Sequence, residues 1–270
     1  MELVYAKSNW EMGEASLEAF LQRSCEDGFN AVEIYLPARP ESGREIGRLV
    51  NSYGVKLIAQ LGTEGATPQA HIESLRAGYA KAVEAGAILA NSHTARDIFS
   101  FEDNCRIFEI ACNLSEQAGV PFVHETHRKR PLFSGPDTRR YLDAVPRLRL
   151  TADFSHWFCV HESDLSDQPE NVAAAIARTD HIHARVGFEE GPQIPDPSAP
   201  EWQETVAKFM GFWQRIITAR KDDGAPYLTI TPEFGPPPYM PSEPHTQRPL
   251  ADAWTVNVAF LHTLKEQLHV

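Results

Sequence analysis

The sequence has no long hydrophobic run and is poor in cysteine. No stretch approaches the roughly 20 apolar residues that a membrane-spanning helix needs, so we expect no membrane partner. The four cysteines show neither paired nor CxxC spacing, which favours buried, reduced thiols in a cytoplasmic protein over a disulfide scaffold. The N-terminal residues 1–5 run directly into a predicted strand, and we therefore expect no secretory signal.

Basic residues are also scarce, with 25 Lys and Arg against 37 Asp and Glu and a net charge of −12. Binding to a phosphate backbone requires basic surface, so the charge argues against nucleic acid as a partner. A glycine-rich turn after the first predicted strand is missing as well. Lys7-Ser8-Asn9-Trp10 has none of the glycines that cradle a dinucleotide pyrophosphate.

Strand-like runs and amphipathic helical runs alternate along the whole chain. The predicted strands are residues 3–6, 31–36, 56–61, 87–91, 121–125, 148–153, 181–186 and 227–231. The predicted helices are residues 16–26, 41–52, 68–84, 102–117, 137–144, 169–178, 201–221 and 250–267. Strict alternation implies parallel strands joined by right-handed crossovers. Eight such units predict an α/β fold, a (β/α)8 TIM barrel that forms a single domain over residues 1–270, with a doubly wound open sheet as the alternative.

Four residues with metal-binding side chains stand at the ends of the last four predicted strands: Glu125, Asp153, His183 and Glu233. Any one of them alone is better explained as a helix cap, a surface charge or a satisfied core residue. Four successive strands with ligands at the same end, however, predict one shared site at the carboxyl end of the barrel. His183 lies nearer that end than His181, so we expect His183 to be the ligand and His181 a buried, hydrogen-bonded neighbour.

Three carboxylates and one imidazole favour a single hard divalent cation, with Mn²⁺ first and Mg²⁺, Co²⁺ or Zn²⁺ as alternatives. Such a cation polarises a carbonyl and acidifies the adjacent C–H bond. Glu125 and Glu233 come from strands separated by two others, so they are suited to remove and return a proton.

The chain resembles the xylose-isomerase-like TIM barrels, a superfamily of sugar isomerases and epimerases that also contains the family 2 AP endonucleases. The resemblance rests on Glu125, Asp153-Phe154-Ser155-His156, His181-Ile182-His183 and Glu233 at matching strand ends. It implies that Glu125, Asp153, His183 and Glu233 bind the metal and that the two glutamates act as acid and base. It also implies that His156 binds substrate or a second metal and that His93 is a further site histidine.

The chain departs from the family pattern at two places. Arg185 stands where many members have lysine in His-x-Lys-Asp, and it either binds a substrate oxygen or forms an internal ion pair. Pro131 replaces the second glutamate of the epimerases, for which His127 is a substitute. Aromatic residues near strand ends, Trp157 among them, either stack on a sugar or pack against the barrel top or a second subunit, so a homo-oligomer is an alternative to a monomer.

These features predict a metal-dependent sugar isomerase or epimerase that acts on a small polyhydroxy carbonyl substrate by proton transfer. One alternative is elimination by the same metal and base, as in a dehydratase or lyase of a keto-inositol or keto-glycoside. Phosphodiester cleavage, as in an AP endonuclease, is opposed by the negative charge and by the incomplete three-metal ligand set. A non-catalytic sugar- or metal-binding module would need no inward acid/base pair.

Overall fold

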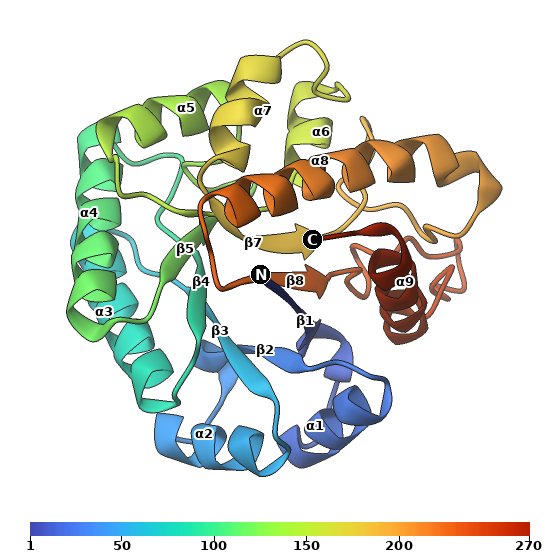
Figure 1. Ribbon diagram of the computed structural model, residues 1–270, viewed down its shortest axis with the longest axis horizontal. Helices are drawn as coiled ribbons and strands as arrows, with labels where there is room; N and C mark the ends of the chain where they lie inside the picture. The colour runs from blue at the N-terminus through green and yellow to red at the C-terminus, as the bar shows by residue number, and fades with distance from the viewer.

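The computed structural model describes residues 1–270 and confirms the TIM barrel. Eight parallel strands form a closed barrel, with β8 paired to β1, and the helices surround it (Figure 1). The strands are β1 (Glu2–Ser8), β2 (Ala31–Tyr35), β3 (Lys56–Gly62), β4 (Leu89–His93), β5 (Phe122–Glu125), β6 (Leu150–Ala152), β7 (Thr179–Ala184) and β8 (Tyr227–Pro232). Observed and predicted strand ends differ by a few residues, most visibly at β1, β4, β6 and β7.

The outer layer consists of α-helices, and several of them begin at a Ser or Thr N-cap. The helices are α1 (Leu17–Glu26), α2 (Gly43–Ser52), α3 (Pro68–Glu84), α4 (Phe101–Ala118), α5 (Gly135–Ala144), α6 (Ser155–His161), α7 (Pro169–Ile176), α8 (Gln203–Asp222) and α9 (Ala253–Gln267). Ser16, Ser42 and Thr67 accept a hydrogen bond from a backbone N–H in the first turn of the helix that follows each of them. Gly119 ends α4 in the left-handed conformation, as a glycine C-cap does.

Helix α6 was not predicted. It has only seven residues, and its N-cap Phe154 makes no side-chain hydrogen bond, so the usual start signal is missing. Four of its residues, Ser155 to Phe158, are buried, which leaves little of the polar face that an amphipathic pattern requires. The helix packs His156 and Trp157 into the protein directly after β6.

The barrel interior changes from apolar to charged along the strands. A small cluster of six residues fills the part nearest the strand starts: Val4, Ala6, Ala31, Ile58, Leu89 and Val123. Beyond it lie buried polar side chains, including Asn91, Thr151 and Thr229, and then the histidines and carboxylates near the strand ends. A packed apolar base thus supports a polar site at the carboxyl end.

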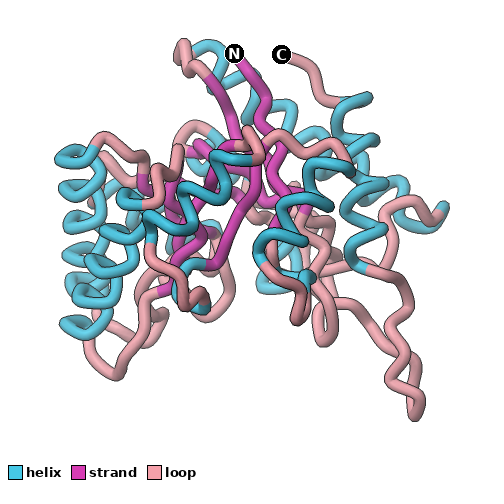
Figure 2. Tube along the Cα trace, turned by 90° about the horizontal axis from the view of Figure 1, so that it is seen from below, coloured by secondary structure: helices cyan, strands magenta, loops and turns pink.

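The longest connections lie at that same end. The chain's two termini meet at one end of the barrel, and long loops project from the other (Figure 2). The loops after β7 (residues 185–199) and after β8 (residues 233–252) are the proline-rich segments of the sequence. Among the helices, none combines the length and the apolar character needed to span a bilayer.

Candidate functional site

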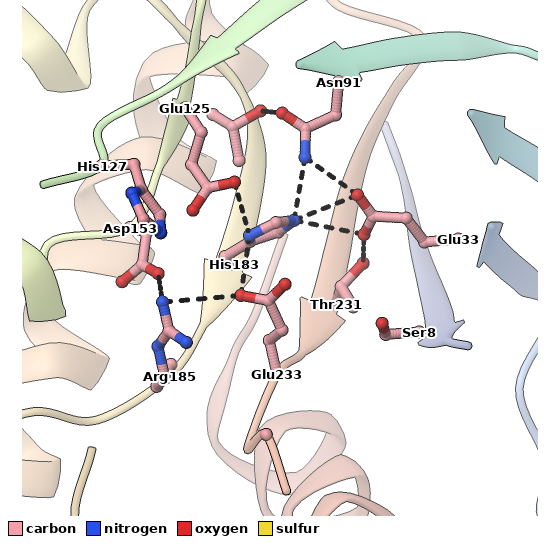
Figure 3. A network of polar contacts seen from close by, with 12 residues as sticks. Ser8, Glu33, Asn91, Glu125, His127, Asp153, His183, Arg185, Thr231 and Glu233 are labelled. Carbon is pink, nitrogen blue, oxygen red and sulfur yellow. Dashed lines mark hydrogen bonds and ion pairs between the residues drawn. The ribbon is translucent and has the colours of Figure 1, made fainter. Parts of the chain in front are cut away.

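The four predicted metal ligands come together at the carboxyl end of the barrel. Glu125 ends β5 and His183 lies in β7, while Asp153 and Glu233 directly follow β6 and β8. One ligand atom from each lies within 4.8 Å of the others, and all four side chains are buried. Nδ1 of His183 is 2.8 Å from Oε2 of Glu233 and 3.4 Å from Oε2 of Glu125 (Figure 3). Three carboxylates and an imidazole therefore converge on one point.

Two buried atoms at this point, Nδ1 of His183 and Oε2 of Glu233, lie 2.8 Å apart, but neither forms a well-aligned hydrogen bond. Buried polar atoms in proteins nearly always form hydrogen bonds, so these two atoms are available to a further partner that binds between them. A divalent cation accepts both kinds of ligand atom and prefers oxygen-rich surroundings. The residues at the site thus fit a metal ion.

Glu33 contacts His183 on the side away from the other carboxylates. It was not recognised as a site residue from the sequence. Its carboxylate lies 3.1 Å from Nε2 of His183, on the opposite side of the ring from Glu125 and Glu233 (Figure 3). It also accepts hydrogen bonds from Thr231 (2.7 Å) and Asn91 (2.9 Å). The signal was present in the sequence, because Glu33 is an acidic residue between apolar neighbours in the middle of a strand.

His181 is buried and hydrogen-bonded, as the sequence predicted. Its Nδ1 contacts the hydroxyl of Thr229 at 2.7 Å, and its Nε2 lies 3.2 Å from Glu33. Both ring nitrogens are therefore engaged in the layer below the site, whereas Nδ1 of His183 faces the carboxylates.

Burial and neighbouring charges set the protonation states. Burial opposes the charge of Glu125, but His93 and His183 hold the pKa of Glu125 well below its usual range. Burial likewise disfavours a charged His183, yet the carboxylates of Glu233, Glu33 and Glu125 raise the pKa of His183 well above 6.5. Burial raises the pKa of Asp153 to about 6. Without a cation, the excess negative charge is thus balanced by protons and by Arg185.

A pocket of about 570 Å³ is lined by two of the four predicted ligands, Glu125 and Glu233, while Asp153 and His183 lie outside its lining. Glu125 and Glu233 line its floor together with Arg185, and Trp10 and Tyr239 form part of its wall. The two aromatic rings meet edge to face, with centroids 5.0 Å apart. A pocket of this size suits a small molecule such as a sugar.

His93 and His127 stand beside Glu125 at the pocket surface. Nε2 of His93 lies 2.7 Å from Oε2 of Glu125, and the two imidazole rings are 4.5 Å apart. Together with Glu125 they form another group in which one ligand atom from each residue lies within 4.8 Å of the others. His93, the further site histidine that the resemblance implies, and His127 therefore both line the pocket next to Glu125.

Two further predicted residues, His156 and Arg185, are buried next to the ligands. Nη2 of Arg185 forms an ion pair with Asp153 and donates to Nε2 of His156 at 2.8 Å. Arg185 lines the pocket, whereas His156 does not. The internal ion pair that was the alternative for Arg185 is therefore present.

Trp157 does not reach the pocket. Its side chain is completely buried in the hydrophobic core, and its indole N–H donates to the carbonyl of Leu132 at 3.1 Å. Because α6 turns this side chain toward the helical layer, Trp157 cannot stack on a substrate, and we leave it out of the proposed site. Trp10 and Tyr239 occupy the wall instead.

Comparison with known proteins gives a family and a fold. Residues 21–191 match the family model described as xylose isomerase-like TIM barrel. No curated protein matches the sequence.

Several solved structures share the architecture. A D-psicose 3-epimerase, solved in the presence of D-fructose, has 12% sequence identity and a TM-score of 0.63, with 98% of this chain and 99% of that chain covered. A probable 3-DHS dehydratase from Bacillus anthracis has 15% identity and a TM-score of 0.62, with coverages of 97% and 98%. A family 2 AP endonuclease from Brucella melitensis has 11% identity and a TM-score of 0.64, with coverages of 87% and 93%. At these identities the likeness is one of fold.

Proposed function

Because the chain belongs to the xylose isomerase-like TIM barrel family, we propose that it is a divalent-metal-dependent isomerase or epimerase. Its substrate is a small polyhydroxy carbonyl compound, and its chemistry is proton transfer at the carbon next to the carbonyl. Mn²⁺ is the cation that we expect, held by Glu125, Asp153, His183 and Glu233.

The observation that supports this most directly is the position of two carboxylates. Glu125 and Glu233 come from β5 and β8, both line the pocket, and both approach Nδ1 of His183. A bound divalent cation would polarise the substrate carbonyl and acidify the neighbouring C–H bond. Two carboxylates around one small cavity can then take a proton from one face of a carbon and deliver one to another position.

In the proposed reaction, the two glutamates take up and supply the protons. One carboxylate accepts the proton from carbon, and the electron pair of the broken C–H bond moves onto the carbonyl oxygen as an enolate. The other glutamate, in its protonated form, returns a proton to the opposite face, which gives an epimer. Return to the former carbonyl carbon gives an aldose–ketose isomer, provided that the proton of the adjacent hydroxyl moves to the former carbonyl oxygen while the hydroxyl carbon becomes the new carbonyl. His93, at 2.7 Å from Glu125, fixes the orientation of that carboxylate.

Solvent exchange tests this proposal. The protein is incubated with Mn²⁺ in D2O and with a panel of unphosphorylated ketoses, keto-inositols and 3-keto-glycosides, and mass spectra of the products are recorded. We expect one deuteron at the carbon next to the carbonyl, and we expect exchange to disappear in Glu125→Gln and in Glu233→Gln. Loss of water or of a glycosidic group in the same spectra would identify the elimination reaction instead.

Glu109→Gln is the control, because Glu109 is an exposed glutamate on α4 and the substitution makes the same chemical change outside the site. If Glu125→Gln and Glu233→Gln bound metal and both retained full exchange, the two-carboxylate mechanism would be wrong.

A further inference from the structure

Arg185 places a permanent positive charge among the predicted metal ligands. The residue directly follows β7, and its side chain is only 2% exposed. Its Nη2 forms an ion pair with Oδ2 of Asp153 and lies 3.8 Å from Oε2 of Glu233 (Figure 3). The guanidinium thus contacts two of the four residues that would hold the cation.

Asp153 has no oxygen that is free of a donor. Its Oδ1 accepts hydrogen bonds from the backbone N–H of Ser155 at 3.1 Å and from the Ser155 hydroxyl at 2.5 Å. Its Oδ2 faces Arg185, whose Nε also donates to the Ser155 hydroxyl at 3.2 Å. A cation that uses Oδ2 would stand beside the guanidinium, and in a buried site two like charges at this range repel strongly.

The guanidinium also contacts the aromatic rings of the pocket wall. Its central carbon lies 4.7 Å from the ring centroid of Tyr239 and 5.9 Å from that of Trp10, both within the range of a cation–π contact. Both rings belong to the pocket wall, which Arg185 itself also lines. A small movement away from Asp153 would therefore carry the positive charge toward the aromatic wall and the substrate space.

We propose that Arg185 competes with the divalent cation for Asp153. Arg185 neutralises the carboxylates when no cation is bound and thereby lowers the affinity of the site for metal. Because coupling between two binding events is reciprocal, metal binding in turn releases Arg185 from Asp153 toward Tyr239 and the pocket. The inference rests on the metal site of the proposed function.

The test is the affinity for Mn²⁺, measured by isothermal titration calorimetry at one pH. We expect Arg185→Gln to bind Mn²⁺ at least about tenfold more tightly than the wild type, within the range usual for coupled sites. Arg149→Gln is the matched control, because Arg149 pairs with Asp180 through two hydrogen bonds of 2.6 and 2.7 Å at the start of β7, away from the site. Its Mn²⁺ affinity should equal that of the wild type. Equal or weaker binding by Arg185→Gln would overturn the proposal.

Arg185→Gln leaves buried carboxylates without a counter-charge and can prevent folding. A second variant, Arg185→Lys, tests the proposal in that case. Arg185→Lys keeps the charge but has no fork to reach Ser155, His156 and Asp153 together, so we expect Mn²⁺ affinity above that of the wild type. Unchanged or weaker affinity in Arg185→Lys would count against competition. If neither the wild type nor the variants bound Mn²⁺, the metal site and the proposed function would fail. Binding that is equal in all of them would remove only this inference.

Discussion

Glu33 and His183 face each other across the barrel, with Oε1 of the carboxylate 3.1 Å from Nε2 of the imidazole. Burial opposes the charge of Glu33, but His183 and His181 hold the pKa of Glu33 well below its usual range, so the group stays a carboxylate. An ionised acceptor at Nε2 keeps the proton on that nitrogen and turns Nδ1 toward Glu125 and Glu233. Carboxylates behind metal-binding histidines have this orienting effect in many metal sites.

Glu33→Gln should therefore weaken Mn²⁺ binding by about 10- to 100-fold, the usual effect of losing such a partner. Thr231→Val removes only one hydrogen bond to Glu33, the 2.7 Å bond from the threonine hydroxyl, and should have a smaller effect. Competition with a fluorescent chelator measures both affinities. An unaltered affinity in Glu33→Gln would mean that His183 needs no partner to present Nδ1.

The pocket wall can be tested at Gly235. A Cβ at this position would lie 2.4 Å from two atoms of the Trp10 ring, closer than any real contact. Gly235→Ala should therefore push Trp10 away from Tyr239 and raise KM for the substrate severalfold, with a smaller change in kcat, because Trp10 shapes the pocket but has no group for proton transfer. Steady-state kinetics measures this split.

Gly211→Ala is the control for that substitution. Gly211 lies inside α8, and an added Cβ there meets nothing within 4 Å. Alanine in place of glycine in a helix interior should stabilise the protein by roughly 0.5–1 kcal/mol and leave KM unchanged. Thermal unfolding with kinetics on both variants separates the two effects. Equal KM values for the two variants would show that Trp10 does not contribute to binding.

A buried ion pair joins Lys7, near the carboxyl end of β1, to Glu11, which follows that strand. Lys7 is fully buried and its Nζ lies 4.2 Å from the ring centroid of Trp254. Lys7→Met alone leaves the Glu11 carboxylate buried without its partner and should cost about 3–5 kcal/mol of the free energy of unfolding. The double variant Lys7→Met with Glu11→Leu removes both charges, so it should be more stable than Lys7→Met. Urea unfolding gives the values, and a double variant less stable than the single one would be the contrary result.

His71 should make stability depend on pH. Burial lowers the pKa of His71 below 6.5, and Arg130 and Arg96 act in the same direction against the hydrogen bond to Gly65. The folded protein thus takes up the His71 proton at a lower pH than the unfolded chain, which takes it up around pH 6.5. The stability from this residue is complete above pH 6.5 and is lost as the pH falls below it, by up to about 1.4 kcal/mol per pH unit.

His71→Gln removes the titration but keeps a donor and an acceptor for Gly65 and Thr63, the partners of His71 at 3.1 and 2.7 Å. The free energy of unfolding of this variant should fall less steeply than that of the wild type as the pH drops below 6.5. Denaturant unfolding at several pH values measures the slopes. Parallel slopes would exclude His71 as a source of acid sensitivity.

Much of the fold could be predicted because it depends on local patterns. The alternation of strands and helices, with Ser and Thr caps and Gly119 as a stop signal, is readable from single segments. The convergence of Glu125, Asp153, His183 and Glu233 could also be expected, because parallel strands place their ends on one face. Helix α6 was missed because it is short, buried and without a side-chain cap.

Side-chain contacts between strands that are distant in the sequence could not be predicted. Arg185 was left with two alternatives, because its distance to Asp153 depends on how β6 and β7 are placed. Glu33 was overlooked because it lies at a strand far from the other ligands in the chain and meets His183 only once the barrel closes. Trp157 was wrongly expected at the pocket, because helix α6, which sets the direction of its side chain, was not predicted.

The metal content of the protein tests the central claim most directly. The purified chain is incubated with excess MnCl2, separated from free ions by gel filtration, and analysed by mass spectrometry for metal. We predict one Mn²⁺ per chain in the wild type and in the Glu109→Gln control, and markedly less in Glu125→Gln and Glu233→Gln. A wild type that retained no Mn²⁺, or glutamate variants that retained as much as the wild type, would contradict a metal centre built from these four residues.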